Sequence, residues 1–187
     1  LNGGDRQTLT PGSNRVTNCY IHDFSEVYQT YQPGVRLDGV GNHCDHCEIC
    51  NSPHAAVLYG GNEHLIEYND IHDVVLLSSD AGAIYAGFDW AAHGCVVRYN
   101  RLCDIGANGF TPDGIYWDDG LSGQTAYGNV MKNIKGHSFM IGGGRDNIVE
   151  NNIIINSTMN VHCDTRVRDG ILYDVAKAQK QFFAKCA

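Results

Sequence analysis

Positive charge, proline and long apolar runs are scarce in this chain of 187 residues. Its 13 Lys and Arg against 21 Asp and Glu give a net charge of -8, which argues against nucleic acid and anionic membranes as partners. No run approaches the ~20 apolar residues that cross a bilayer, so no membrane span is expected. With only four prolines and no low-complexity stretch, the chain is also not of the disordered type.

Hydrophobic residues, glycine and cysteine are well represented. The hydrophobic fraction of 43% is ordinary for a globular protein, and the length suits a single domain with a continuous core. The 22 glycines and eight cysteines are many for this length. Composition therefore bounds the class of protein but not its function.

The main feature of the sequence is a pattern of nine or ten residues that recurs six times, at intervals of 22 to 31 residues. The copies cover 14–23, 43–51, 65–73, 96–104, 125–133 and 148–156, and their alignment gives three columns. The first column contains Val16, Cys44, Ile66, Val97, Ala126 and Val149. The second contains Cys19, Cys47, Asn69, Asn100, Asn129 and Asn152. The third contains Ile21, Ile49, Ile71, Leu102, Met131 and Ile154.

Such columns predict a solenoid of stacked rungs, because a repeat of this size can bury its apolar face only against its neighbours. We therefore predict an all-β, right-handed parallel β-helix of about six to seven rungs over residues 1–170. Residues 171–187 have helical spacing and are expected to form a terminal helix that caps or flanks the last rung. A further extended run follows each copy, beginning at Val35, Val57, Ile84, Ile115, Phe139 and Val161.

The second column holds asparagine in its last four copies. An asparagine at the same bend in every rung can pass side-chain hydrogen bonds to the next rung, so these residues should form a ladder. Cys19 and Cys47 take their place in the first two copies. Adjacent rungs are ~4.8 Å apart, so a disulfide between them is sterically possible. We favour the simpler interpretation, two small buried side chains in place of asparagine.

Cys44, Cys47 and Cys50 lie at C-x2-C-x2-C spacing, with His54 four residues further on. This spacing also fits a metal or iron–sulfur site. The repeat, however, directs the first cysteine inward, the second to the bend and the third to the outer corner. We therefore predict that the three sulfurs do not converge on one ion.

Two histidines, His22 and His72, stand at the outer corner in one column with Cys50 and Cys103. Each is followed by an aspartate, and a His-Asp turn is most simply a hydrogen-bonded corner. No metal role is assigned to these histidines. The sequence thus predicts neither a metal site nor a cofactor.

Residues 79–90 and 112–120, on neighbouring rungs, hold the densest acidic and aromatic cluster of the chain. Carboxylates among exposed aromatics suit carbohydrate, because aromatic faces stack on sugar rings and two carboxyl groups can divide the acid and base or nucleophile roles of glycoside cleavage. Like charges one rung apart would also raise the pKa of one carboxyl. Alternatively, the aspartates cap turns or bind a structural cation. The cluster contains Asp80, Tyr85, Asp89, Trp90, Asp113, Tyr116, Trp117, Asp118 and Asp119.

The pairing of these carboxylates depends on how straight the strands are. Straight strands would place Asp80 at the start of one strand and Asp118 at the end of the next, too far apart to act on one bond at ~3.3 Å per residue. Asp80 with Asp113, or Asp89 with Asp118 and Asp119, would then be the nearer pairs. A bend at a glycine of the first strand would bring Asp80 and Asp118 together.

Four blocks carry a family resemblance: residues 4–12, SDAGAIYAG from Ser79, GIYWDDG from Gly114 and IGGGRDNIVENN from Ile141. They resemble bacterial right-handed β-helix proteins of carbohydrate-degrading systems, and most closely glycoside hydrolase family 141. The resemblance covers about residues 3–165. SDAGAIYAG and IYWDDG are its specific parts, since the rung pattern is shared by many lyases, hydrolases and tailspikes.

The resemblance implies a secreted or periplasmic enzyme that acts on plant polysaccharide, with fucosidase or xylanase activity. It places the catalytic pair at Asp80 and Asp118, with Asp119 as the one-residue alternative. The chain departs from the family at Cys47 and Cys50, where asparagine and histidine are expected.

A glycoside hydrolase is therefore the expected function, with carbohydrate as its partner. A polysaccharide lyase stays open, with Arg145 and Lys132 as candidate charge-neutralising and basic groups, and so does a non-catalytic sugar-binding or structural solenoid. No secretory signal stands at the N-terminus, where the pattern is already under way, so we expect a piece of a longer solenoid. The expected substrate contacts are Tyr85, Asp89, Trp90, Asp113, Tyr116, Trp117 and Arg145.

Overall fold

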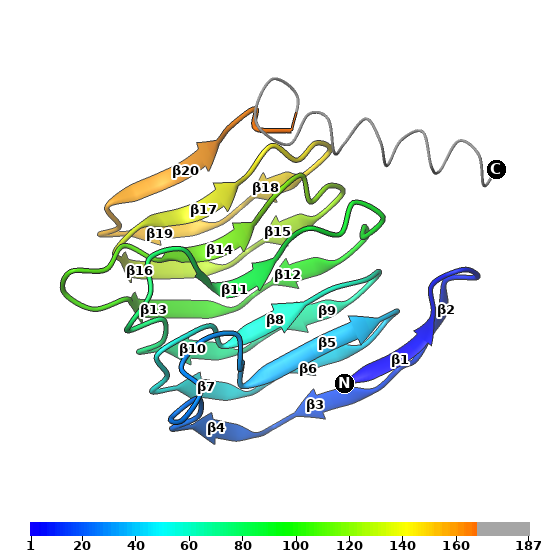
Figure 1. Cartoon of the computed structure of the whole chain (residues 1–187), viewed down its shortest axis with the longest axis horizontal. Coiled ribbons are helices and arrows are strands. Elements are labelled where there is room, and N and C mark those ends of the chain that lie inside the picture. Colours follow the sequence, from blue (N-terminus) through cyan, green and yellow to red (C-terminus); the bar gives the residue numbers. More distant parts are fainter. Residues whose placement is uncertain (168–187) are drawn as a thin grey trace.

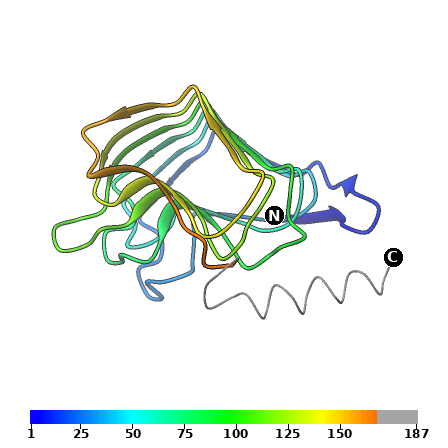
Figure 2. The ribbon, with the colours of Figure 1, turned by 90° about the horizontal axis from the view of Figure 1, so that it is seen from above.

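The computed structural model describes residues 1–167 and is a solenoid of three sheets. Strands of successive rungs pair in parallel along its whole length (Figure 1). Seen along the stack, the rungs enclose one shared interior (Figure 2). The predicted parallel β-helix is thereby confirmed. The helix expected over residues 171–187, and the end of the 1–170 segment, lie outside the described residues.

The recurring pattern builds two six-stranded sheets, because each copy makes two short strands joined by a bend. The first sheet contains β3 (Arg15–Thr17), β6 (His43–Asp45), β9 (Leu65–Glu67), β12 (Val96–Arg98), β15 (Thr125–Tyr127) and β18 (Ile148–Glu150). The second contains β4 (Tyr20–His22), β7 (Glu48–Cys50), β10 (Asp70–His72), β13 (Arg101–Ile105), β16 (Val130–Ile134) and β19 (Ile153–Ile155).

The predicted further runs form a third, eight-stranded sheet. An antiparallel pair, β1 with β2, lies at its N-terminal edge. No helix occurs among residues 1–167, so none of them forms a helix able to cross a membrane. The third sheet contains β1 (Asn2–Asp5), β2 (Thr10–Pro11), β5 (Val35–Gly39), β8 (Val57–Tyr59), β11 (Gly82–Ala86), β14 (Asp113–Trp117), β17 (His137–Ile141) and β20 (Met159–Cys163).

The strand register confirms the two predicted apolar columns. Members of the first column pair in sequence from Val16 to Val149, and members of the third from Ile21 to Ile154. Members in the middle rungs have no accessible surface, whereas these four terminal ones are partly buried. Each fully buried aliphatic side chain contributes ~1.5–3 kcal/mol, so the columns are the main stabilising element.

Each rung turns at residues in the left-handed backbone conformation. One such residue lies between the first and second sheets, and another lies at the end of the second-sheet strand, directly after it in four rungs and as its next-to-last residue in β13 and β16. The second set is always aspartate or asparagine, whose short side chains tolerate this conformation better than other L-residues. Identical corners therefore keep the rungs in register. This second set contains Asp23, Asn51, Asp73, Asp104, Asn133 and Asn156.

The predicted asparagine ladder is confirmed. The side-chain amide of Asn69 donates to Asn100 Oδ1 at 2.9 Å, that of Asn100 to Asn129 Oδ1 at 3.0 Å, and that of Asn129 to Asn152 Oδ1 at 2.9 Å. Each acceptor oxygen also takes the backbone N–H of the preceding asparagine. The backbone N–H of Cys47 donates to Asn69 Oδ1 at 3.0 Å, so the ladder ends on a cysteine.

The two cysteines of this column do not form a disulfide, and the prediction that both are buried is right for Cys47 but wrong for Cys19, which lies in the first rung, where no earlier described rung covers it. Both are free thiols, Cys19 exposed and Cys47 buried, as are the other five cysteines of residues 1–167. Hydrogen bonding from Cys44, and then from Cys19, lowers the pKa of Cys47 to about 6. Cys47 is therefore more prone to ionise than Cys44, whose pKa the same hydrogen bond raises.

A second polar ladder, which the sequence did not reveal, follows the corner between the third and first sheets. The side chain of Asn14 donates to Asn42 Oδ1 at 2.9 Å, and the Asn42 backbone N–H donates to His64 Nδ1 at 3.1 Å. Two rungs further on, the backbone N–H of Gln124 donates to Asn147 Oδ1 at 2.9 Å. Because asparagine alternates here with histidine and glutamine, no single residue type fills this corner in every rung.

Asp45, on β6, should make the stability of the fold pH-dependent. Its side chain is 1% exposed and accepts hydrogen bonds from Arg15 Nη2 at 2.7 Å, Thr17 Oγ1 at 2.9 Å and His46 Nδ1 at 2.8 Å. Arg15 first of all holds the pKa of Asp45 well below its usual range. The carboxylate therefore stabilises the fold above its unfolded pKa of ~3.9, and this contribution is lost as pH falls toward the folded pKa.

We expect Asp45→Asn to lower the free energy of unfolding at pH 7 by ~1.5–3 kcal/mol, the usual worth of hydrogen bonds to a charged group. The difference between variant and wild type should shrink as the pH is lowered below 4. Urea titrations at several pH values measure both effects. Asp146→Asn, at an exposed aspartate, is the control. A pH-independent difference would show that charge plays no part.

Candidate active site

The outward face of the third sheet carries the predicted acidic and aromatic cluster. Tyr85 on β11 pairs with Tyr116 on β14, and Met140 on β17 continues their column. The two tyrosine rings meet edge to face, with centroids 5.2 Å apart. Because side chains alternate along a strand, Tyr85 and Tyr116 point out while their neighbours Ile84 and Ile115 point into the core.

Asp118 directly follows β14 and is the most fully engaged carboxylate of the cluster. It accepts hydrogen bonds from the Tyr85 hydroxyl at 2.9 Å, the Asp119 backbone N–H at 2.8 Å and Arg166 Nη1 at 2.8 Å. Its side chain is 10% exposed. The site thus holds a negative charge largely away from bulk water, balanced by one guanidinium.

Asp119 is turned toward the same arginine. A left-handed backbone conformation, with φ of 42°, places its carboxyl oxygen 3.4 Å from Arg166 Nη1, and the indole N–H of Trp90 donates to its carbonyl oxygen. Burial, and then the charge of Asp118, raises the pKa of Asp119. Two adjacent carboxyl groups therefore reach one nitrogen, and one of them keeps its proton to higher pH than usual.

Arg166 and Asp164, which the sequence analysis missed, complete this cluster. Asp164 fixes the guanidinium through Nε at 2.8 Å and Nη2 at 2.6 Å. The strand register offered a signal, because Trp117, Ile141 and Cys163 are successive partners, so that Asp118, Gly142 and Asp164 follow in one column. Gly142 leaves the space for Arg166, since a Cβ there would lie 2.9 Å from the guanidinium carbon.

Asp80 joins the cluster through the tyrosines. The Tyr116 hydroxyl donates to Asp80 Oδ1 at 3.3 Å, while the adjacent Tyr85 hydroxyl donates to Asp118. Burial, and then the charge of Asp118, raises the pKa of Tyr116. Asp80 is thus linked to Asp118 through the edge-to-face rings of Tyr116 and Tyr85, and the direct pairing of the two carboxyl groups stays a prediction.

Two further aspartates are already paired within the protein. Asp113 is buried and accepts hydrogen bonds from both the backbone N–H and Nδ1 of His137, each at 2.8 Å, and burial raises its pKa. Asp89 forms an ion pair with Arg6 from the β1–β2 connection, at 2.8 Å. Arg6 thus holds the Asp89 carboxylate, and the pairing of Asp89 with Asp118 or Asp119 stays a prediction.

Trp117 is not a surface residue, and the prediction that it lines a groove is wrong. Its side chain is fully buried in the core. Trp117 lies on the same side of β14 as the inward-facing Ile115, and it pairs with Ala86 on the neighbouring strand. The small alanine side chain leaves room for the indole inside the rung.

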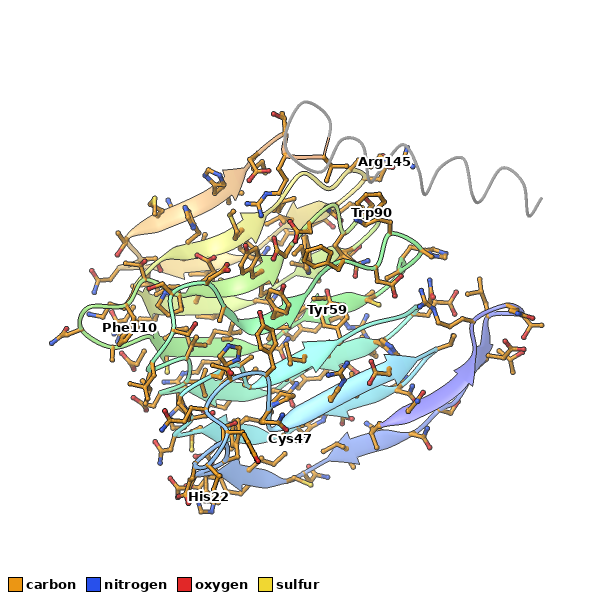
Figure 3. The ribbon with its side chains drawn as sticks, viewed as in Figure 1. His22, Cys47, Tyr59, Trp90, Phe110 and Arg145 are labelled. Atoms are coloured by element: carbon orange, nitrogen blue, oxygen red, sulfur yellow. The ribbon has the colours of Figure 1, made fainter. Side chains whose placement is uncertain are left out.

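Two shallow depressions flank the cluster. One, of about 280 Å³, is lined by Tyr85 and Asp89 together with Tyr31, Arg36 and Asp38. The other, of about 390 Å³, is lined by Trp90, Arg145 and His93. Trp90 and Arg145 lie close together in Figure 3. Four of the predicted contact residues thus line concave surface. Arg145, 86% exposed, is free to reach a ligand.

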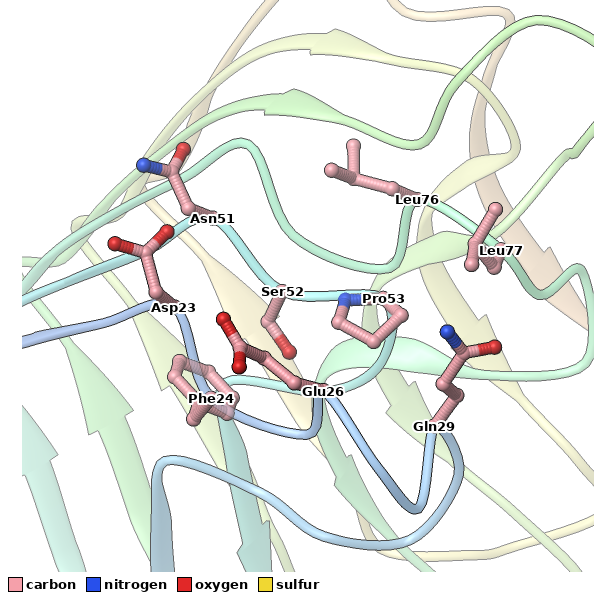
Figure 4. A pocket seen from close by; sticks show the side chains of 9 residues that line it. All are labelled: Asp23, Phe24, Glu26, Gln29, Asn51, Ser52, Pro53, Leu76 and Leu77. Carbon is pink, nitrogen blue, oxygen red and sulfur yellow. The ribbon is translucent and has the colours of Figure 1, made fainter.

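A third hollow, of about 560 Å³, lies at the corner after the second sheet (Figure 4). Asp23 and Glu26 lie on one side and Leu76 and Leu77 on the other. No residue of the aspartate cluster lines it. It is therefore not part of the candidate site.

The thiols of Cys44 and Cys47 are hydrogen-bonded to each other but Cys50 stands apart, so the three sulfurs do not converge on one ion, as predicted. Cys44 lies in the core column and Cys47 at the bend, whereas Cys50 faces outward from β7. They do not form a ligand cluster among the described residues. The His-Asp corners are also as predicted, with Nδ1 to carboxylate distances of 2.7 Å for His22 and 2.8 Å for His72.

Comparison with protein families gives the handedness of the solenoid and the family to which it belongs. Residues 33–180 match the family described as a right handed beta helix region. The chain belongs to the right-handed β-helix family. No curated protein and no solved structure gives a significant match to this β-helix. The fold is common to glycosidases, lyases and other proteins, so family membership alone leaves activity and substrate open.

Proposed function

We propose that this β-helix is a glycoside hydrolase whose active site is the outward face of β11 and β14. One observation carries the proposal: Asp118 and Asp119 both reach Arg166 Nη1, while Asp118 also accepts a hydrogen bond from Tyr85. Glycoside cleavage needs a protonated carboxyl beside an ionised one. The flanking depressions, lined by Tyr85 and Trp90, supply aromatic surface for sugar rings.

The different environments of the two carboxyl groups support a division of roles between them. Asp119, whose pKa is raised by burial and by Asp118, is the general acid that protonates the leaving oxygen. Asp118, paired with Arg166, is the nucleophile or the base. Asp80, reached through Tyr116, is the alternative partner and would stand further from the acid. The resemblance to glycoside hydrolase family 141 favours plant polysaccharide as the substrate and a secreted or periplasmic location.

Incubation of the purified chain with a panel of plant glycans tests the proposal through the chemistry of the products. Reducing ends without unsaturation are expected. Unsaturated ends would establish a lyase instead, and binding without cleavage would establish a sugar-binding solenoid. The lyase is the less supported outcome, because Lys132 lies on β16 of the second sheet, paired with Cys103 and Ile155, away from Arg145.

Proton NMR of the first-formed anomer distinguishes the two carboxylate pairs. Retention is expected for Asp118 with Asp119, because retaining enzymes hold their carboxyl groups ~5–5.5 Å apart. Inversion would favour Asp119 with Asp80, since inverting pairs stand ~6.5–9.5 Å apart to admit a water.

The raised pKa of Asp119 predicts the alkaline limb of the pH profile. Activity needs the protonated acid, so kcat/KM should fall as pH rises through the pKa of Asp119, which lies above the ordinary aspartate value. In Asp119→Asn this limb should disappear along with most of the activity. If the residual activity of this variant still falls with rising pH in the same way, a group other than Asp119 is the general acid. The pH profiles should be measured with a substrate that carries a good leaving group. Its cleavage needs little help from an acid, so the variant keeps enough activity to measure.

A further inference from the structure

The outer face of the second sheet gathers three side chains of metal-ligand type. Glu48 and Cys50 are two residues apart on β7, on either side of the inward-facing Ile49, and therefore share the outer face. His72 on β10 is the register partner of Cys50. A carboxylate oxygen of Glu48, Cys50 Sγ and a ring nitrogen of His72 all lie within 4.8 Å of one another.

The orientation of His72 is fixed by its own corner. Asp73 Oδ2 lies 2.8 Å from Nδ1, so in the neutral ring Nδ1 carries the proton and Nε2 presents its lone pair. Nε2 stands 3.4 Å from Glu48 Oε1. The lone pair of Nε2 then faces the Glu48 carboxylate, an arrangement that a cation bound between the two groups makes favourable.

We propose that Glu48, Cys50 and His72 bind a divalent transition metal of the zinc class. Sulfur, imidazole nitrogen and carboxylate oxygen are the donors that Zn²⁺ takes, at ~2.0–2.3 Å. The carboxylate of Asp73 behind the imidazole is the usual partner of a metal-binding histidine. Three protein ligands leave a fourth, solvent-facing position, and the ion would join two successive rungs.

The geometry needs only small adjustments to fit this ion. Donor atoms around a tetrahedral zinc are roughly 3.3–3.8 Å apart, and the Nε2 to Oε1 distance of 3.4 Å already agrees. Glu48, 51% exposed, can close the remaining distance to the sulfur by rotation about its side-chain bonds. Cys50, buried beneath the others, needs no movement of the backbone.

The neighbouring positions on the same face define the limits of the site. Cys103, one rung beyond His72, has Lys132 as its next register partner, a cation that opposes metal binding. His22, one rung before Cys50, has its Nδ1 held by Asp23 at 2.7 Å in the same way as His72. The cluster of donors is therefore centred on β7 and β10.

Metal content and cobalt spectroscopy of the full chain test this site. After dialysis against Zn²⁺ and removal of the free ion, we expect about one zinc per chain. Replacement by Co²⁺ should give a thiolate-to-cobalt charge-transfer band. Glu48→Gln and His72→Gln should each weaken zinc binding at least tenfold, and Asp73→Asn by about 10–100-fold.

Matched variants separate this site from the other thiols and carboxylates of the chain. Glu150→Gln, at an exposed strand position, and Cys47→Ser should leave the affinity and the cobalt band unchanged. Cys50→Ser should abolish the band; should it fail to fold, the exposed Glu48→Gln and His72→Gln still decide. Zinc binding that persists in those two variants, or a folded chain that binds no zinc, would overturn the proposal and leave a His72–Glu48 ion pair.

Discussion

Asp118→Asn should lower the turnover of the cleaved glycan by two to four orders of magnitude or more, since acid–base assistance alone contributes ~10²–10⁴-fold. The amide has the shape of the carboxylate and can still accept the Tyr85 hydroxyl, so the fold should persist. It carries no negative charge, however, and therefore cannot act as nucleophile or base. Initial rates on the substrate identified by product analysis measure the effect, and thermal unfolding reports on the fold.

Asp146→Asn is the matched control for this variant. Asp146 lies near the same end of the third sheet and makes only a 3.9 Å contact with Arg145. Its loss should leave turnover at saturating substrate within a factor of two or so, because it touches no group of the aspartate cluster and lines only the neighbouring depression, where it would affect KM. If Asp118→Asn and Asp146→Asn prove equally active, Asp118 has no catalytic role, and Asp80→Asn and Asp119→Asn become the decisive pair.

Asn100→Ala should be strongly destabilising, costing roughly 3–5 kcal/mol. Asn100 Oδ1 accepts from the backbone and side chain of Asn69, and its amide donates to the Ile66 carbonyl at 2.9 Å and to Asn129. Removal leaves the Asn69 N–H and the Ile66 carbonyl buried without partners, each at ~1–3 kcal/mol. Chemical denaturation followed by circular dichroism measures the loss.

The exposed corner offers a matched control for the ladder. The Asn156 amide donates to Asn133 Oδ1 at 2.7 Å, so it makes the same kind of inter-rung contact in water. Asn156→Ala should change stability by no more than about 0.5 kcal/mol, because solvent replaces the lost bond. Equal effects of Asn100→Ala and Asn156→Ala would mean that burial of the ladder contributes nothing to its strength.

The sequence was sufficient to predict the fold and its register because the same physical demand recurs in every rung. A side chain that points into the core must be apolar. Ile49, Ile71 and Leu102 can therefore be aligned from the sequence alone. The second polar ladder was missed for the opposite reason. The corner position of that ladder is filled by histidine, glutamine or asparagine in different rungs. No single residue type therefore marks the position in every copy of the sequence.

The candidate site was predicted less completely. It depends on the positions of the functional groups at the tips of the side chains, which the arrangement of the strands does not fix. Asp118 and Tyr85 were identified from composition, whereas Arg166 lies beyond the last recognisable copy and reaches back across Gly142. Trp117 was misplaced because aromatic character was weighed above strand alternation. Ile115 points inward, and a residue two positions further along the strand must do the same.

The constant corners have a consequence for how such a protein can change over time. The intervals between copies vary from 22 to 31 residues although the paired columns stay aligned, so the extra residues collect in the connections between sheets. The longest of these, residues 23–34 between β4 and β5, carries Tyr31 to the ring of Tyr85. Insertions can therefore reshape the surroundings of the aspartates without disturbing the stack. A lineage could exchange one ligand for another by lengthening loops, while the scaffold and its polar ladders are inherited unaltered.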